Sequence, residues 1–210
     1  MEMENIKEIV LELRENGFCV LKDFWSFEKC RQAIDDLSRI NKNNFEIGQG
    51  GDIRCQRSHL FSKVINNFFE DKYINEIASK YSSCSMANRV LAGVLEPIEG
   101  KLVDSGGGWH VDSAASHQFK SILYLTDVSS KNGPFLFIPK SKKVINDIPK
   151  YDNMRIDENT IKEYFFEDDI EEIVGSAGTC ILVDTTYAHR GKQIEEGKRI
   201  SLTTYFYEEK

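Results

Sequence analysis

The chain has 210 residues and a formal net charge of −7, and 40% of its residues are hydrophobic and 29% charged. This length and composition fit one globular domain with a sizeable core and exclude an intrinsically disordered chain. No apolar run approaches the roughly 18 residues of a membrane span, and the acidic balance argues against a general nucleic-acid binder, which usually carries a basic patch.

The N-terminal part, residues 1–85, is predicted to be mostly helical. Apolar residues recur at helical spacing in its first segment, and Gly17 follows as a suitable helix stop. In chain order, the pattern predicts a helix over 4–16, a short strand over 18–24, a helix over 26–42 capped by Ser26, a polar, glycine-rich loop over 43–58, and a helix or broken helix over 61–81.

From residue 86 onward, strand-like runs alternate with turn signals such as EPIEG, SSKNGP, GSAG and EEGK. Many short strands with turns between them predict a sandwich or jelly roll. The strands are expected at 86–96, 108–113, 119–128, 134–138, 170–174, 179–184 and 199–207. The polar segment of about 140–168 interrupts them, and both an insertion or lid and a solvated excursion fit it. Without repeats or a linker, we expect a single domain over 1–210 with a β core over 86–210.

The compartment is suggested by the first residues and by the cysteines. The opening MEMENIKEIVLELRENGF is acidic and amphipathic, and it lacks the basic and apolar regions of a signal peptide. The five cysteines include no CxxC motif, and an odd count without a secretion signal favours free thiols. We therefore expect a cytoplasmic protein.

The stretch GGGWHVDS, residues 106–113, contains His110 and Asp112. Alternate side chains of a strand share one face, so these two project together with Val111 packed behind them. They can supply two adjacent metal ligands, although a hydrogen-bonded His–Asp pair is the structural alternative. His189 lies 79 residues later, at the end of GTCILVDTTYAHRG, and can supply a third ligand. Two histidines and one carboxylate on one octahedral face are typical of non-haem Fe(II) oxygenases.

Arg199 follows His189 by ten residues, in GKRISLTTYF. Strand alternation places Arg199, Ser201 and Thr203 on one face. If that face lines the interior, the buried guanidinium needs an anion, and its planar fork suits a carboxylate, to which Ser201 can add a hydroxyl donor. A dicarboxylate could then chelate the metal at one end and meet Arg199 at the other. The alternative is a surface arginine paired with Glu195 or Glu196.

The segments WHVD, SILYLTDVSSKNGPFLFIPKSKK and AHRGKQIEEGKRISLTTYF resemble the phytanoyl-CoA dioxygenase family of Fe(II)- and 2-oxoglutarate-dependent oxygenases. The opening ELRENGFCVLKDFWSFEKCRQAID is also similar to the start of such proteins, and the likeness is weakest in 40–85 and 141–168. The resemblance implies a mainly β protein with flanking N-terminal helices (α+β) and a double-stranded β-helix core of the jelly-roll or cupin-like kind.

The resemblance also implies roles for particular residues. It assigns His110, Asp112 and His189 to Fe(II) and to catalysis, and Arg199, supported by Ser201, to the far carboxylate of 2-oxoglutarate. Lys120 and Tyr124 share the parity of interior positions and are further candidates to hold this cosubstrate, and the alternative for Lys120 is a lysine at the rim of the site. The implied reaction consumes O₂ and releases succinate and CO₂. Related halogenases lack the carboxylate ligand, so the presence of Asp112 favours hydroxylation.

The chain is short for the family, which argues against a bulky acyl-CoA substrate. We expect a small-molecule substrate such as a metabolite, a sugar or a natural-product intermediate, with no nucleic-acid or membrane partner; the sequence does not define an oligomeric state. One rival is a cupin-like metal enzyme that does not use 2-oxoglutarate, although such sites more often have extra histidines and this chain has four. The other is a non-catalytic β-sandwich binding module.

Two further residues have two interpretations each. His117 either lies near the metal or is a solvated loop histidine, and Asp184 either accepts a hydrogen bond from a ligand imidazole or serves in a turn. Trp109 is expected to pack behind its strand, and Arg190 to point away from the interior. The segments 43–58 and 140–168 are candidates for loops that close over the site.

Overall fold

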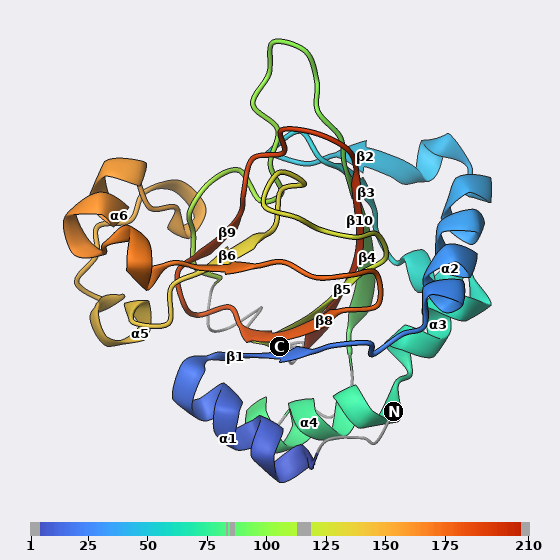
Figure 1. The fold of residues 1–210 in the computed structure, drawn as a ribbon, viewed down its shortest axis with the longest axis horizontal. Helices are drawn as coiled ribbons and strands as arrows, with labels where there is room; N and C mark the ends of the chain where they lie inside the picture. The colour runs from blue at the N-terminus through green and yellow to red at the C-terminus, as the bar shows by residue number, and fades with distance from the viewer. Residues whose placement is uncertain (1–4, 83, 85–86, 113–118, 207–210) are drawn as a thin grey trace.

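The computed structural model describes residues 5–82, 84, 87–112 and 119–206, and two antiparallel sheets form the body of this part of the chain (Figure 1). The larger sheet has seven strands in the order β1-β8-β5-β10-β4-β3-β2, and the smaller has three in the order β7-β6-β9. The strands are β1 (Phe18–Leu21), β2 (Phe45–Ile47), β3 (Ile53–Cys55), β4 (Arg89–Leu95), β5 (Phe119–Tyr124), β6 (Phe135–Phe137), β7 (Glu171–Ile173), β8 (Cys180–Asp184), β9 (His189–Gly191) and β10 (Arg199–Phe206).

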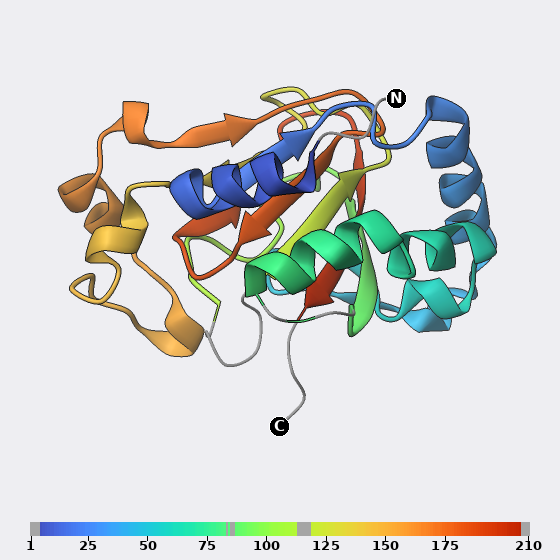
Figure 2. The same ribbon diagram turned by 90° about the horizontal axis from the view of Figure 1, so that it is seen from below.

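Helices cover the larger sheet from outside. Figure 2 shows α1 and α4 lying across its lower face, and α2 and α3 pack together beside β4 and β10. The helices are α1 (Ile6–Asn16), α2 (Phe27–Arg39), α3 (Lys63–Phe69), α4 (Lys72–Ser82), α5 (Ser141–Val144) and α6 (Glu158–Tyr164). The predicted mainly β fold with N-terminal helices is confirmed. No helix in the described ranges is both long and apolar enough to cross a membrane.

Helix α1 ends and α2 begins where the sequence predicts, because of their capping residues, whereas α2 ends at Arg39, three residues before the predicted end. Gly17 follows α1 with a φ of 83° and donates its N–H to Leu13 O at 2.9 Å. A Cβ at Gly17 would lie 2.6 Å from the Tyr187 ring, so both the backbone conformation and the space require glycine. Ser26 caps α2 by accepting a hydrogen bond from Lys29 N at 3.3 Å.

Two predicted elements are wrong. Residues 43–58 are not a loop, because they contain the hairpin β2–β3, whose second strand pairs with β4 at the sheet edge. Each strand has only three residues, of which two are exposed in β2 and one in β3, so the apolar pattern is too short to detect. The expected strand over 108–113 reduces to isolated bridges at His110, and its last residue lies outside the described part. The expected helix over 61–81 is broken, and the Asp71 side chain caps the second half.

The segment of about 140–168 is a packed insertion, seen at the left of Figure 1 with α5 and α6. Its apolar side chains form a cluster with Trp109 and Val111, both nearly inaccessible to solvent. This packing excludes the solvated excursion and fits an insertion. Trp109 packs behind the site as expected. Through this cluster the insertion supports the segment that carries His110 and Asp112.

Candidate metal centre

The backbone holds His110 and His189 directly opposite each other. His110 N donates to His189 O at 3.0 Å and His189 N donates to His110 O at 2.9 Å, which is a reciprocal antiparallel pair. Asp112 N donates to Thr185 O at 2.8 Å, which ties the third residue to the segment before β9. One ligand atom from each of the three side chains lies within 4.8 Å of the other two. The side chains of His110 and Asp112 share a face, although no regular strand surrounds them.

Both imidazoles are oriented by backbone carbonyls. His110 Nδ1 lies 2.9 Å from Gly108 O, and His189 Nδ1 lies 2.8 Å from Tyr187 O. A carbonyl can only accept, so each Nδ1 carries the proton and each Nε2 offers a lone pair, as in metal-bound histidines. Asp184 is not the acceptor for either ring: its carboxylate accepts from Tyr81 Oη at 2.7 Å and Thr186 N at 2.9 Å, which is the turn role.

The protonation states suit a divalent cation. Burial lowers the pKa of His189 to about 4, and burial together with the neighbouring His189 lowers the pKa of His110 well below its usual value. Burial alone would raise the pKa of the Asp112 carboxyl, but the Lys120 ammonium and the two histidines outweigh it and hold that pKa far below its usual range. Two neutral imidazoles and an ionised carboxylate are the forms that bind metals.

Lys120 and Tyr124 both reach the cavity from β5, but each already has a protein partner. Lys120 forms an ion pair with Asp112, and its side chain is 11% exposed, so it is not a rim lysine. The Tyr124 hydroxyl donates to Ile173 O at 2.9 Å and accepts from Phe135 N at 3.0 Å. The two residues therefore lie where the sequence predicts, while their contact with a cosubstrate stays a prediction.

Arg199 lies on β10 with 6% of its surface exposed, and Ser201 and Thr203 line the same cavity. Its guanidinium donates to Ser105 Oγ at 2.6 Å and to Gly133 O. No carboxylate of the described residues lies within 4.0 Å of it, and its buried Nε has no hydrogen-bond partner. The surface alternative is wrong, since Glu196 pairs with Lys131 instead. A buried guanidinium with only neutral acceptors provides a site for an anion.

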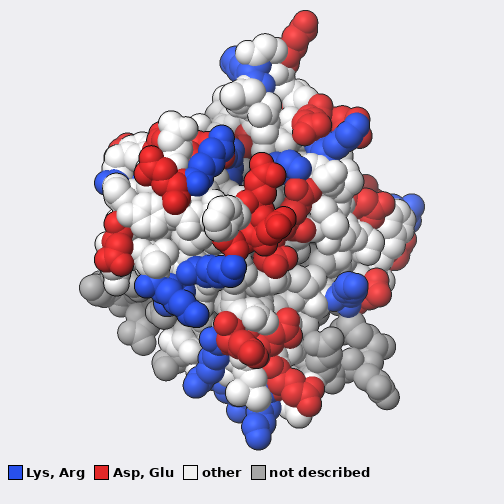
Figure 3. All heavy atoms as spheres, turned by 60° about the vertical axis from the view of Figure 1, so that its left-hand side comes forward, with Lys and Arg blue, Asp and Glu red and all other residues white. Residues whose placement is uncertain are grey.

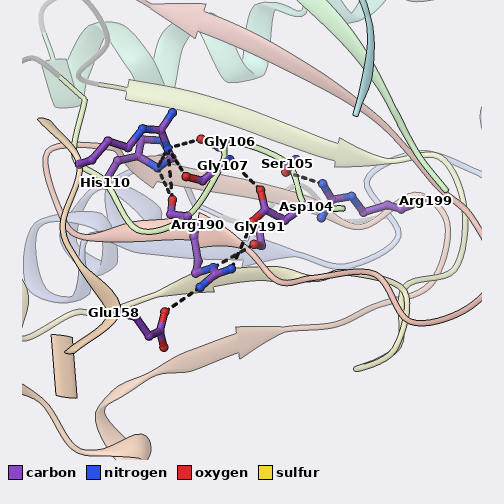
Figure 4. A network of polar contacts seen from close by, with 11 residues as sticks. Asp104, Ser105, Gly106, Gly107, His110, Glu158, Arg190, Gly191 and Arg199 are labelled. Carbon is purple, nitrogen blue, oxygen red and sulfur yellow. Dashed lines mark hydrogen bonds and ion pairs between the residues drawn. The ribbon is translucent and has the colours of Figure 1, made fainter. Parts of the chain in front are cut away.

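The loop before His110 connects the metal centre to Arg199 (Figure 4). Ser105 accepts from Arg199 and, through its backbone oxygen, from Gly191 N at 3.0 Å. Asp104 forms an ion pair with Arg190 at 3.2 Å, and Arg190 also contacts Glu158. Arg190 thus lines the cavity, contrary to the expectation that it points away. Nothing in the sequence marked Ser105, because its contact with Arg199 spans 94 residues.

The three glycines of this loop suit its backbone conformation, and Gly106 is also required by its surroundings. Gly106, Gly107 and Gly108 have φ of 102°, 72° and 94°, a region that favours glycine. A Cβ at Gly106 would lie 2.9 Å from the His110 ring. Their carbonyls converge on the Arg155 guanidinium, which donates to Gly106 O, to Gly107 O at 3.0 Å and to Gly108 O at 3.4 Å. Arg155 belongs to the insertion, and sequence reasoning missed it.

Replacing Arg155 by alanine is expected to weaken divalent-metal binding about tenfold, because outer partners of a ligand histidine contribute about that much. The guanidinium orders the carbonyl of Gly108, which in turn orients His110. Calorimetric titration with Ni²⁺ measures the effect, and Arg155→Lys should restore part of it. Arg31→Ala, on the exposed side of α2, is the matched control. Equal affinities for Arg155→Ala and wild type would exclude this positioning role.

The structure describes one of the two remaining histidines, His59. His59 stacks on the Phe69 ring with centroids 4.2 Å apart, and it does not line the cavity of the metal centre. His117 lies outside the described residues.

Comparison with known proteins gives one family and one fold. The family model described as phytanoyl-CoA dioxygenase matches residues 13–199. No curated protein matches the chain by sequence. Among solved structures, the 2-oxoglutarate-dependent carbocyclase SnoK from nogalamycin biosynthesis is 15% identical, with 96% of this chain and 83% of that chain covered and a TM-score of 0.74.

Two further structures are similar at the same level. EctD from S. alaskensis with bound Fe is 17% identical, with coverages of 94% and 75% and a TM-score of 0.71. HygX from Streptomyces hygroscopicus with nickel and 2-oxoglutarate bound is 12% identical, with coverages of 96% and 87% and a TM-score of 0.70. At these identities the likeness shows the shared jelly-roll fold.

Proposed function

Because the chain belongs to the phytanoyl-CoA dioxygenase family, we propose that it is an Fe(II)- and 2-oxoglutarate-dependent oxygenase with His110, Asp112 and His189 as metal ligands. One observation carries the proposal: a single cavity contains both this triad and the buried Arg199. The triad fits Fe(II), and among the described residues Arg199 has no carboxylate to neutralise it. A metal-chelating dicarboxylate satisfies both requirements.

When bound, Fe(II) and 2-oxoglutarate supply the O₂-dependent decarboxylation to succinate and CO₂, coupled to oxidation of a substrate C–H bond. The chain supplies geometry and charge. Gly108 and Tyr187 keep the two imidazoles in the ligand tautomer, and Lys120 keeps Asp112 ionised. Arg199 binds the far carboxylate, with Ser201 and Ser105 as neighbouring hydroxyls. Phe135, with its ring centroid 5.6 Å from that of His189, helps to exclude water from this side.

Hydroxylation of a small molecule is the finer proposal. The presence of Asp112 supports it, because in the related halogenases the halide takes the position that the missing carboxylate leaves open. The cavity volume of about 300 Å³ is at the low end for ligand pockets, which supports a small substrate. The structural neighbours include an epimerase and a carbocyclase, so the type of oxidation has to be measured. We place this activity in one domain of a cytoplasmic protein, in keeping with the absence of disulfides among the described cysteines.

Succinate release tests the proposal. Purified protein with Fe(II), 2-oxoglutarate and O₂ should release succinate slowly without substrate and faster with a matching metabolite from a screen. Oxygen uptake that needs iron but not 2-oxoglutarate would favour the cupin-like alternative. Folded, iron-loaded protein that neither decarboxylates 2-oxoglutarate nor consumes O₂ would favour a binding module.

A further inference from the structure

The cavity of the metal centre is basic, although the chain has a net charge of −7. Two acidic side chains, Asp52 and Asp112, line it. The basic ones are Arg54, Arg89, Lys120, Arg155, Arg190 and Arg199. On the outer face in Figure 3, by contrast, acidic and basic side chains are interspersed. Concentrating one sign of charge in a cavity of an acidic protein attracts ligands of the opposite sign.

The excess of basic groups persists when the proposed cofactors are included, because a divalent metal and a dianionic cosubstrate cancel. Arg54 is neutralised by Asp52 at 2.7 Å, and Lys120 by Asp112. Arg190 is neutralised by Asp104 and Glu158, so it does not contribute to the excess. Arg155 donates to backbone carbonyls and to the Gln49 amide, none of which carries charge. The cavity therefore has an excess of positive charge that can bind an anion in addition to 2-oxoglutarate.

The basic side chains lie at opposite ends of the cavity face that β10 forms with its neighbouring strands. Arg199, Ser201, Thr203 and Tyr205 of β10 all line the cavity. Tyr205 lies opposite Arg89 on β4 and Lys120 on β5, six residues from Arg199 and thus about 20 Å along the strand. The Arg89 guanidinium carbon lies 4.5 Å and Lys120 Nζ 4.9 Å from the centroid of the Tyr205 ring.

This arrangement of basic side chains gives the cavity two ligand sites, one at each end. Asp112 contacts Lys120, so the metal centre adjoins the Tyr205 end of the cavity. A cosubstrate that extends from the metal to Arg199 fills the other end. The space that remains for a substrate then lies at the Tyr205 end of the cavity. Arg89 and Tyr205 line the cavity at this end.

We propose that the substrate is a small organic anion whose carboxylate or phosphate group is bound by Arg89 at the Tyr205 end of the cavity. This proposal rests on the proposed function, since it assumes that Arg199 is occupied by 2-oxoglutarate. A guanidinium is planar and suits both kinds of anion, and its position over the Tyr205 ring restricts its motion before the ligand arrives. The cavity volume of about 300 Å³ limits the anion to a small one.

Ligand-detected NMR tests this with matched pairs of small molecules. The protein is saturated with redox-inert Ni²⁺ and with 2-oxoglutarate, and each carboxylic acid is compared with its primary amide, and each phosphate monoester with its parent alcohol. We expect the binders to be anions, with the neutral partner at least about tenfold weaker. Whichever anion class binds identifies the group. Arg89→Gln should abolish the preference, Arg89→Lys should retain part of it, and Arg39→Gln on the exposed face of α2 should leave it intact.

Three results would overturn the proposal. The first is that neutral partners bind as tightly as the anions, and the second is an anion preference that survives Arg89→Gln. Anion signals that disappear as 2-oxoglutarate increases would place the anions at Arg199 and also overturn it. Binding of 2-oxoglutarate itself is followed in the same spectra. Failure of wild type to bind it contradicts the proposed function, whereas the anion–neutral comparison judges Arg89 separately.

Discussion

Replacing His189 by alanine is expected to lower 2-oxoglutarate-dependent succinate release to below about 1% of wild type and to weaken Fe(II) binding at least about 100-fold, since loss of a mere outer partner already costs 10- to 100-fold. His189 is 3% exposed, and its Nε2 is the part of the ring left free by the bond to Tyr187 O. Alanine removes this ligand and leaves two. Anaerobic metal titration and a succinate assay measure the two effects.

The matched control is His59→Gln, which changes a histidine outside the cavity. It should retain the metal affinity and the succinate release of wild type. Circular dichroism tests whether His189→Ala is folded. His189→Gln repeats the test with less loss of side-chain volume in the core. Retention of wild-type metal affinity by folded His189→Ala would remove His189 from the metal site.

Arg199→Ala is expected to raise the KM for 2-oxoglutarate by roughly 100-fold, because removing one partner of a buried charge pair costs about 2–5 kcal/mol. The guanidinium is buried, and its described contacts are a hydroxyl and a carbonyl. We therefore propose that the carboxylate of the cosubstrate is its charge partner. Arg199→Lys keeps the charge and loses the planar fork, so its KM should lie between those of alanine and wild type.

The affinity for the metal alone separates this effect from general damage to the site. Arg199→Ala should bind Ni²⁺ as wild type does in the absence of 2-oxoglutarate, since Arg199 lies on β10 and the triad on other segments. An unchanged KM in a folded variant would reject Arg199 as the anchor. A loss of metal affinity equal to the rise in KM would show that the substitution acts through the triad.

The residues brought together by strand parity were accessible to sequence analysis. His110 and Asp112 share a face even though 108–113 is not a regular strand, because an extended backbone alternates its side chains with or without a paired neighbour. Arg199, Ser201 and Thr203 line one cavity for the same reason. Strand parity predicts the wrong direction for the Arg190 side chain, because β9 is only three residues long and the long side chain bends back to Asp104.

Contacts between distant segments were not accessible. Arg155 and Ser105 act through bonds to residues at least 47 positions away, and neither has a motif. The hairpin β2–β3 was missed because each strand presents three residues, too few for an alternation to be distinguished from a polar loop. The glycines of 106–108 are evident in the sequence, but the close approach of Gly106 to the His110 ring depends on the folded backbone and could not be predicted from it.

The most direct measurement of the central claim is the visible absorption spectrum of the protein mixed anaerobically with Fe(II) and 2-oxoglutarate. If the triad and 2-oxoglutarate bind the same Fe(II), wild type should show a weak charge-transfer band. The band should vanish in His110→Ala, and in Arg199→Ala it should appear only at much higher 2-oxoglutarate. A folded wild-type protein that shows no band at saturating Fe(II) and 2-oxoglutarate, and that releases no succinate when O₂ is admitted, would contradict the account.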